Sequence, residues 1–122
     1  MSAPPPIELR RVRTVDEVEA ARAHTARGRP LLLVVKAAWC ERCPAFSAAV
    51  GELATRYDFE YCYTDANDTD LTEHYDITML PAFVLYKTPD AEPLVRAAAT
   101  PAQVTESVKG HCAPCLVLDA EF

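Results

Sequence analysis

An uninterrupted run of apolar residues near position 31 is the feature that most restricts the fold of this chain. Residues 31–35 are all apolar and lie between Pro30 and Lys36, without the alternation of a strand that has one face in water. Such a run is typical of a central strand that helices cover on both faces. The run is also far too short to cross a bilayer. The sequence therefore predicts an α/β fold with a buried strand at its centre.

The segments around this strand predict the remaining elements. Before the central strand they are an edge strand at 7–12 and a helix from a capping box at 14–17 to about residue 26. After it come a helix at 40–57, a strand at 59–63 and a short helix that ends near 75. The last elements are strands at 81–86 and 94–98 and a helix from 101 to about 109, where Gly110 ends it. The predicted order is β-α-β-α-β-α-β-β-α, with a mixed sheet of four to five strands between helices. With 122 residues, one domain is expected at 7–110, with a disordered segment at 1–6 and a tail at 111–122.

Charge and the N-terminal residues narrow the class of protein. Residues 31–122 hold six basic and fourteen acidic side chains, within a net charge of -6, so no basic surface for nucleic acid is expected. The N-terminus contains three consecutive prolines and lacks the basic-then-apolar order of a secretory signal. The expectation is a cytoplasmic protein in a reducing compartment, with no membrane partner.

Cysteine spacing is the strongest chemical signal. Four of the five cysteines form two C-x-x-C pairs, Cys40/Cys43 and Cys112/Cys115, and in a reducing compartment such pairs indicate redox chemistry or metal binding. The fifth, Cys62, falls in a predicted core strand and is expected to be buried as a small apolar residue.

The first pair sits between the central strand and a predicted amphipathic helix. A cysteine in the first turn of a helix meets unpaired N–H groups and the positive end of the dipole, which favour the thiolate. A second cysteine one turn later can attack a mixed disulfide and release the partner. Zinc ligation, or chance spacing of two buried cysteines, remains the alternative at this point.

Two segments resemble the signatures of a known family. Residues 37–43, Ala-Ala-Trp-Cys-Glu-Arg-Cys, resemble the active-site segment of thioredoxins, and residues 75–83 resemble their second signature. The resemblance covers about residues 7–110 and implies the thioredoxin fold. It also implies a groove in which Trp39 forms an apolar rim, the Leu80 backbone pairs with substrate, and Pro81 faces the cysteines. A cis Leu80–Pro81 bond would explain a proline at the head of a core strand.

The leading hypothesis is therefore a thiol:disulfide oxidoreductase of the thioredoxin type, with Cys40 as nucleophile and Cys43 as resolving cysteine. It needs no cofactor beyond the dithiol, and its partners would be protein disulfides and a reductase or oxidase that exchanges electrons with it. The rival hypothesis is a thioredoxin-fold binding module or zinc-binding protein without redox turnover.

Three departures from the family pattern qualify the resemblance. Most thioredoxins have a buried acid six residues before the first cysteine, where this chain has Val34, so deprotonation of Cys43 must use water or another group. The residues between the cysteines are Glu41 and Arg42 in place of Gly-Pro, and their opposite charges leave the net effect on the thiolate open. Pro44 follows the second cysteine directly, which costs little in the first turn of a helix.

The tail pair has no counterpart in the plain thioredoxin pattern. Cys112 and Cys115 are interpreted as a second redox pair, as an inert or locally disulfide-bonded tail, or, with His111, as three ligands of a metal site. Both C-x-x-C pairs together would also suit a four-cysteine zinc site. In the family fold the last helix leads away from the active site, so the tail cysteines are expected to start far from Cys40. The oligomeric state is expected to be a monomer or a weak disulfide-linked dimer.

Overall fold

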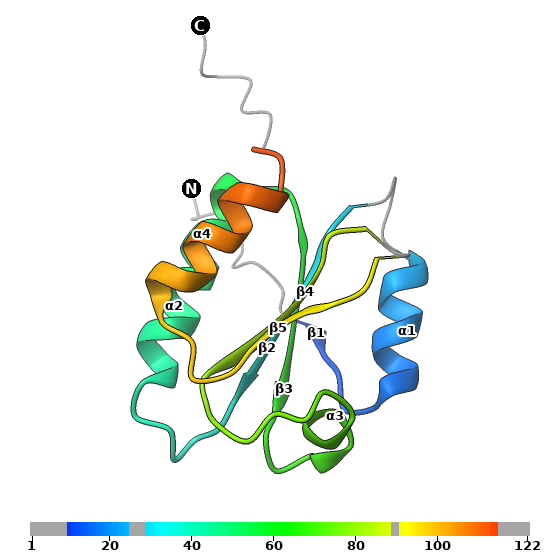
Figure 1. Cartoon of the computed structure of the whole chain (residues 1–122), viewed down its shortest axis with the longest axis vertical. Coiled ribbons are helices and arrows are strands. Elements are labelled where there is room, and N and C mark those ends of the chain that lie inside the picture. Colours follow the sequence, from blue (N-terminus) through cyan, green and yellow to red (C-terminus); the bar gives the residue numbers. More distant parts are fainter. Residues whose placement is uncertain (1–9, 25–28, 89–90, 115–122) are drawn as a thin grey trace, which may run out of the picture.

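The computed structural model describes residues 10–24, 29–88 and 91–114, and Figure 1 shows a central sheet with helices on both sides. The elements are β1 (Arg10–Arg11), α1 (Val15–His24), β2 (Leu31–Lys36), α2 (Cys43–Arg56), β3 (Glu60–Asp65), α3 (Thr69–His74), β4 (Ala82–Tyr86), β5 (Leu94–Arg96) and α4 (Pro101–His111). This is the predicted order, so the predicted fold class is confirmed. The segment 1–6, expected to be disordered, lies outside the described residues.

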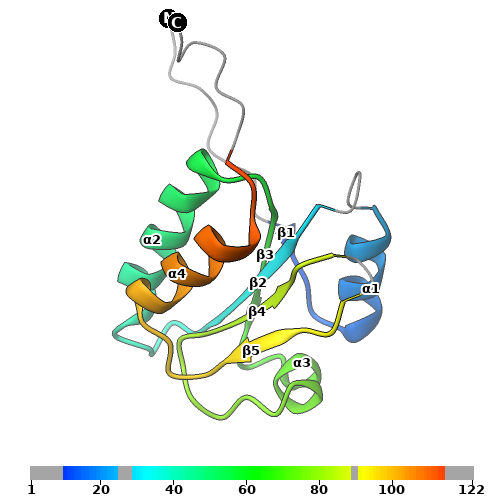
Figure 2. The same cartoon turned by 45° about the horizontal axis from the view of Figure 1, so that its top comes forward.

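β2 is the central strand of the sheet, as its apolar run predicts. The strand order is β1-β3-β2-β4-β5, and Figure 2 shows β5 at one edge. β1, β3 and β2 are mutually parallel, whereas β4 runs antiparallel to both β2 and β5. Residues 31–35 are each at most 1% exposed. The sheet is therefore mixed, and its most buried strand leads directly into the first cysteine pair.

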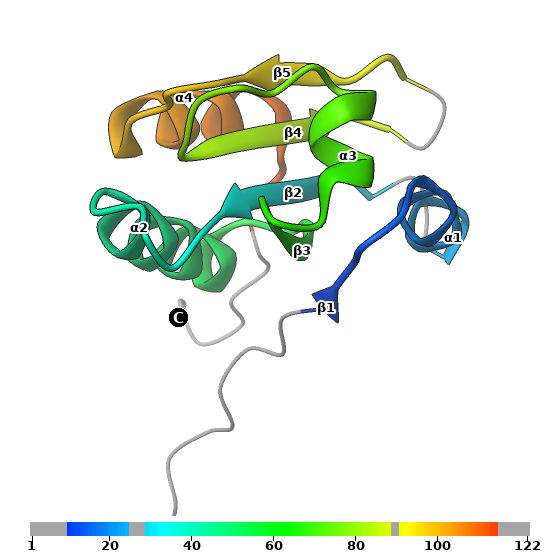
Figure 3. The same cartoon turned by 90° about the horizontal axis from the view of Figure 1, so that it is seen from below.

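The two faces of the sheet carry separate apolar cores. Figure 3 shows α2 and α4 on one side of the strands, and α1 and α3 on the other. On β2, Leu33 and Val35 belong to the core beneath α1 and α3, whereas Leu32 and Val34 belong to the core beneath α2 and α4. Because side chains alternate along a strand, the next residue on the α2 side is Lys36, the last residue of β2.

Hydrogen bonds at the helix ends explain why the helices begin where they do. The predicted capping box of α1 is present: the Glu17 N–H donates to Thr14 Oγ1 at 3.2 Å, and the Thr14 N–H donates to Glu17 Oε1 at 3.3 Å. An equivalent pair of bonds joins Thr100 and Gln103 at the start of α4. These caps satisfy N–H groups that would otherwise lack partners.

Several predicted boundaries are wrong. β5 ends at Arg96 and not at residue 98. α2 begins at Cys43 and not at Cys40, because residues 37–42 form a turn before it. β3 continues to Asp65, since its last two residues pair with Val35 and Lys36 of β2. α4 continues through Gly110 to His111, because the Cys112 N–H still donates to the Val108 carbonyl at 2.8 Å.

Candidate active site

Cys40 and Cys43 lie where the chain leaves β2 and enters α2. Their sulfur atoms form a disulfide, and their Cα atoms are 5.4 Å apart. The Cys40 N–H donates to the Ala37 carbonyl at 3.1 Å, and the Cys43 N–H donates to the Cys40 carbonyl at 3.3 Å. This tight turn holds both sulfurs beside the N-terminus of α2, which favours a thiolate in the reduced form. The site also lies beyond the carboxyl ends of parallel strands, where α/β sheets bind their ligands.

The two cysteines differ in how they meet the surface. Cys40 is 8% exposed and lines a groove of about 400 Å³, whereas Cys43 is 2% exposed and does not line it. The groove is bounded by Trp39, Cys40, Glu41, Arg42, Thr78, Met79 and Leu80. A sulfur atom that enters this groove therefore meets Cys40 first.

The second motif reaches the cysteines from the opposite side of the groove. The Leu80–Pro81 peptide bond is cis, as expected from the proline at the head of β4. Leu80 packs against the small apolar cluster that contains Cys40 and Cys43. The Pro81 carbonyl accepts a hydrogen bond from the Ala99 N–H at 2.7 Å, which ties this loop to the segment before α4. Two motifs about forty residues apart thus form one site.

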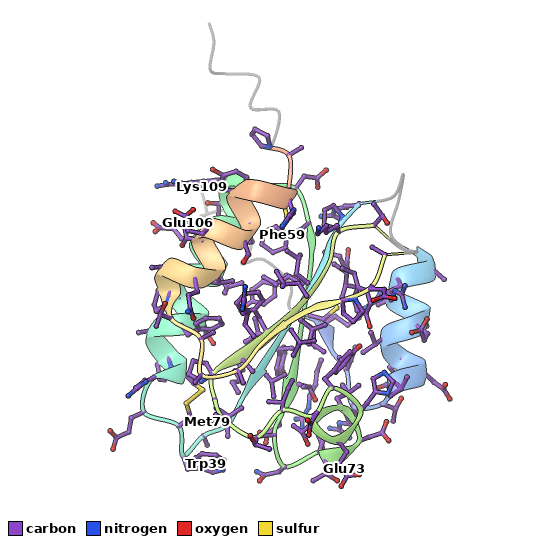
Figure 4. The ribbon with its side chains drawn as sticks, viewed as in Figure 1. Trp39, Phe59, Glu73, Met79, Glu106 and Lys109 are labelled. Atoms are coloured by element: carbon purple, nitrogen blue, oxygen red, sulfur yellow. A yellow bond between two sulfur atoms is a disulfide. The ribbon has the colours of Figure 1, made fainter. Side chains whose placement is uncertain are left out.

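Large apolar side chains form the rim of the groove. Trp39 is 67% exposed and Met79 is 59% exposed, and Figure 4 shows both at the same end of the molecule. Exposed apolar side chains that gather beside a reactive group indicate a docking surface. Sequence reasoning identified Trp39 but missed Met79 and Thr78. Their position directly before Leu80–Pro81, inside the second motif, was the signal available for finding them.

Glu41 and Arg42 carry opposite charges on the same groove. Both side chains are exposed, and within the described parts of the chain neither forms an ion pair. Solvent and salt weaken the field of exposed charges. Their contributions to the stability of a Cys40 thiolate are therefore small and of opposite sign.

Val34 lies at the position where most thioredoxins have a buried acid. Its side chain is fully buried, and its strand neighbours in the register are Tyr63 of β3 and Phe83 of β4. The core beneath the cysteines is therefore apolar at this position.

The tail cysteine Cys112 lies at the other end of the molecule. It is 6% exposed and packs in the core beneath α2 and α4. Next to it, the Ala113 carbonyl accepts the Asp58 N–H at 2.8 Å, and Pro114 bridges to Tyr57, just beyond α2. α2 has 14 residues, so its two ends are about 20 Å apart. Cys112 is thus far from Cys43, as predicted, and Cys115 lies outside the described residues.

Burial should make two cysteines unreactive in the native protein. Loss of solvent raises the pKa of both the Cys62 and Cys112 thiols to about 11, with a further upward contribution from Glu60 and Asp58 respectively. After reduction, iodoacetamide at pH 8 should label Cys62 and Cys112 roughly 100-fold more slowly than Cys40, because so little thiolate is present. Peptide mass spectrometry over time measures this. Labelling of Cys112 at the rate of Cys40 would contradict the burial, and urea should equalise all the rates.

Metal binding by the tail finds no support in the part of the chain that the structure describes. No three His, Cys, Asp or Glu side chains gather there closely enough to hold an ion. His111 is exposed, Cys112 is buried, and Cys40 and Cys43 are bonded to each other. In the same residues, every helix is too short or too polar to cross a membrane.

Known proteins match this chain across most of its length. The thioredoxin family model matches residues 15–110. Thioredoxin Asp f 28 of Aspergillus fumigatus is 34% identical over 86 residues, which cover 69% of this chain and 77% of that protein. Thioredoxin-1 of Caenorhabditis elegans is 35% identical over 63 residues, which cover 50% of this chain and 55% of that protein. The chain thus spans only about half the length of the second relative.

Solved thioredoxin structures share the fold at lower identity. The reduced thioredoxin pre-protein of Schistosoma mansoni has a TM-score of 0.74 at 20% identity, over 85% of this chain and 98% of that chain. Thioredoxin f of spinach chloroplast has a TM-score of 0.73 at 20% identity, over 91% and 98% of the two chains. With the family match over most of its residues and this shared fold, the chain belongs to the thioredoxin family.

Proposed function

We propose that the protein is a thiol:disulfide oxidoreductase that exchanges disulfides with protein partners through Cys40 and Cys43. The observation that carries the proposal is the Cys40–Cys43 disulfide beside a surface groove, with Cys40 as the cysteine that lines it. Membership of the thioredoxin family supports the same chemistry. The unequal burial of the two cysteines supports their roles, Cys40 as nucleophile and Cys43 as resolving cysteine.

The exchange runs in two steps. In the reduced protein, the Cys40 thiolate attacks one sulfur of a partner disulfide, forms a Cys40–partner bond, and releases the other sulfur as a thiolate that takes up a proton. Cys43 then loses its proton and attacks Cys40 Sγ. This forms the Cys40–Cys43 bond and releases the second partner thiolate. Two electrons pass from the protein to the partner, and the reverse sequence oxidises a partner dithiol.

The groove favours an extended, partly apolar segment around the partner's cysteine. Trp39 and Met79 offer exposed apolar surface on the groove that Cys40 lines, and the backbone at Leu80 would pair with the segment's own backbone. The dithiol itself supplies the redox chemistry, so no further cofactor enters the proposal. A separate reductase or oxidase would restore the starting state of the pair after each turnover.

Insulin reduction by dithiothreitol tests the proposal. The wild-type protein at micromolar concentration should speed the precipitation of the insulin B chain, measured as turbidity, above the rate with dithiothreitol alone. A Cys115→Ser variant should keep this rate within about twofold, because Cys112 and Ala113 lie beside the end of α2 that is far from Cys40. A wild-type rate equal to that of dithiothreitol alone would favour a binding module without turnover. Loss of the rate in Cys115→Ser would place the tail pair in the turnover.

A further inference from the structure

A second pocket is lined by Cys43 and shares no lining residue with the groove. Its volume is about 420 Å³, and it is lined by Cys43, Pro44 and Ser47 of α2 together with Lys36 and Asp65 at the ends of two strands. Cys43 thus meets water and charged groups through this pocket, whereas Cys40 meets them through the groove. The two cysteines occupy separate electrostatic surroundings although they are bonded to each other.

Strand register explains why two charged residues line this pocket. Lys36 and Asp65 are paired directly in the parallel ladder of β2 and β3, and both are the last residues of their strands. Each follows a row of apolar or aromatic side chains on the α2 side of the sheet, which ends with Val34 on β2 and Tyr63 on β3. Directly paired residues of parallel strands point to the same face. The apolar core beneath α2 therefore ends in a lysine and an aspartate, beside the first turns of that helix.

The contacts of these two residues leave the lysine charge available to the pocket. Lys36 Nζ lies 4.5 Å from the centre of the Tyr63 ring, and Asp65 Oδ1 accepts the Asn67 N–H at 2.8 Å. Lys36 and Asp65 form no direct ion pair with each other in the described structure. Ser47 Oγ is buried in the pocket wall and has no hydrogen-bond partner among the described residues. The wall beside Cys43 thus includes polar groups, among them one cation whose charge no ion pair neutralises in the described structure.

We propose that Lys36 stabilises the thiolate of Cys43 through this pocket and thereby sets the rate at which the mixed disulfide is resolved. The inference rests on the proposed function. Burial of Cys43 disfavours its thiolate, and a positive charge on the pocket wall offsets part of that cost. Asp65 acts with the opposite sign, while Glu41 and Arg42 face the groove on the side of Cys40.

Lys36 favours the step in which Cys43 displaces the partner from Cys40. The Cys43 thiol gives its proton to water in the pocket, and the resulting thiolate attacks Cys40 Sγ. The Cys40–Cys43 bond forms as the Cys40–partner bond breaks, and the partner leaves as a thiolate that takes up a proton from solvent. Lys36 keeps its proton throughout, so it is a positioning residue that acts through its charge.

One equivalent of the disulfide reagent DTNB separates the two steps in a stopped-flow experiment. The first thionitrobenzoate is released when Cys40 attacks the reagent, and the second when Cys43 resolves the mixed disulfide. Every variant carries Cys115→Ser, so that the tail thiol does not contribute. Lys36→Met should slow the second release about threefold to tenfold and leave the first within twofold, since one partly screened charge at this range has that effect. Lys36→Arg should restore the second rate.

Asp65→Asn is the matched control of opposite sign. Removal of this negative charge should speed the second release, which a general loss of structure would not do. The inference would be overturned if Lys36→Met released the second thionitrobenzoate as fast as the Cys115→Ser parent. It would also be overturned if Lys36→Arg failed to restore that rate. A slower second release in Asp65→Asn would also overturn it, because that result would make Asp65 a proton acceptor for Cys43. If the parent itself released no second thionitrobenzoate, the proposed function would fail first.

Discussion

Replacement of Cys43 by serine should stop the protein at a stable mixed disulfide with its partner. Cys40 still lines the groove and attacks the partner as before, but Cys43 is no longer there to displace the partner. Among the described residues, the free cysteines are Cys62 and Cys112, and both are buried. Cys62 belongs to the core beneath α1 and α3, on the opposite face of the sheet, and Cys112 lies beyond the far end of α2. Insulin turnover should therefore fall by roughly 100-fold or more.

Non-reducing gels and intact mass spectrometry would detect the trapped adduct. The Cys43→Ser protein should gain the mass of one whole insulin molecule, because the second interchain disulfide still joins the two insulin chains, and dithiothreitol should remove the adduct. Cys40→Ser is the matched control, and it should give neither turnover nor adduct because Cys43 does not line the groove. Cys62→Ser should keep wild-type turnover. If Cys40→Ser formed the adduct and Cys43→Ser did not, the roles of the two cysteines would be reversed.

Local signals were sufficient to predict most of the fold from the sequence. The unbroken apolar run 31–35 predicted a central strand, and the Thr14 capping box predicted the start of α1; both predictions are confirmed. The start of α2 was wrong because the Cys40–Cys43 spacing suits a helix as well as the tight turn that precedes it. The predicted end of α4 was wrong because a glycine such as Gly110 usually ends a helix. Here Cys112 is buried in the core, and the helix continues past Gly110.

The candidate site was only partly visible in the sequence. Cys40, Cys43, Trp39 and the cis bond at Pro81 follow from two recognisable motifs, and the structure brings those motifs together. The approach of Lys36 and Asp65 to the second pocket depends on the register between two strands about thirty residues apart. Sequence patterns predict which residues form strands but not how paired strands are aligned. The pocket beside Cys43 therefore emerged only from the structure.

Introduction of an acid at position 34, where the thioredoxin resemblance implies one, should destabilise this protein strongly. Val34 is fully buried, and the apolar core to which it belongs includes Phe46 and Phe83. A carboxyl group placed there would be withdrawn from water into a largely apolar core. Val34→Asp should therefore lower the free energy of unfolding by about 3–5 kcal/mol. Because small domains have only about 5–15 kcal/mol in total, much of the stability would be lost.

The pH dependence of this loss distinguishes a buried acid from a simple packing defect. Burial raises the pKa of the introduced carboxyl above its value of about 3.9 in the unfolded chain. As pH rises, the introduced carboxyl therefore loses its proton in the unfolded state before it does so in the folded state. The loss in the free energy of unfolding relative to wild type should grow from pH 4 upward until the folded-state pKa is passed. Urea unfolding of both proteins at pH 4.5 and pH 8 measures the difference. Val34→Thr, the uncharged control of similar shape, should cost about 1–2 kcal/mol at both pH values. A pH-independent loss in Val34→Asp would mean that the carboxyl reaches water or a cation, and Lys36, two residues along the same face, is the cation nearest in sequence.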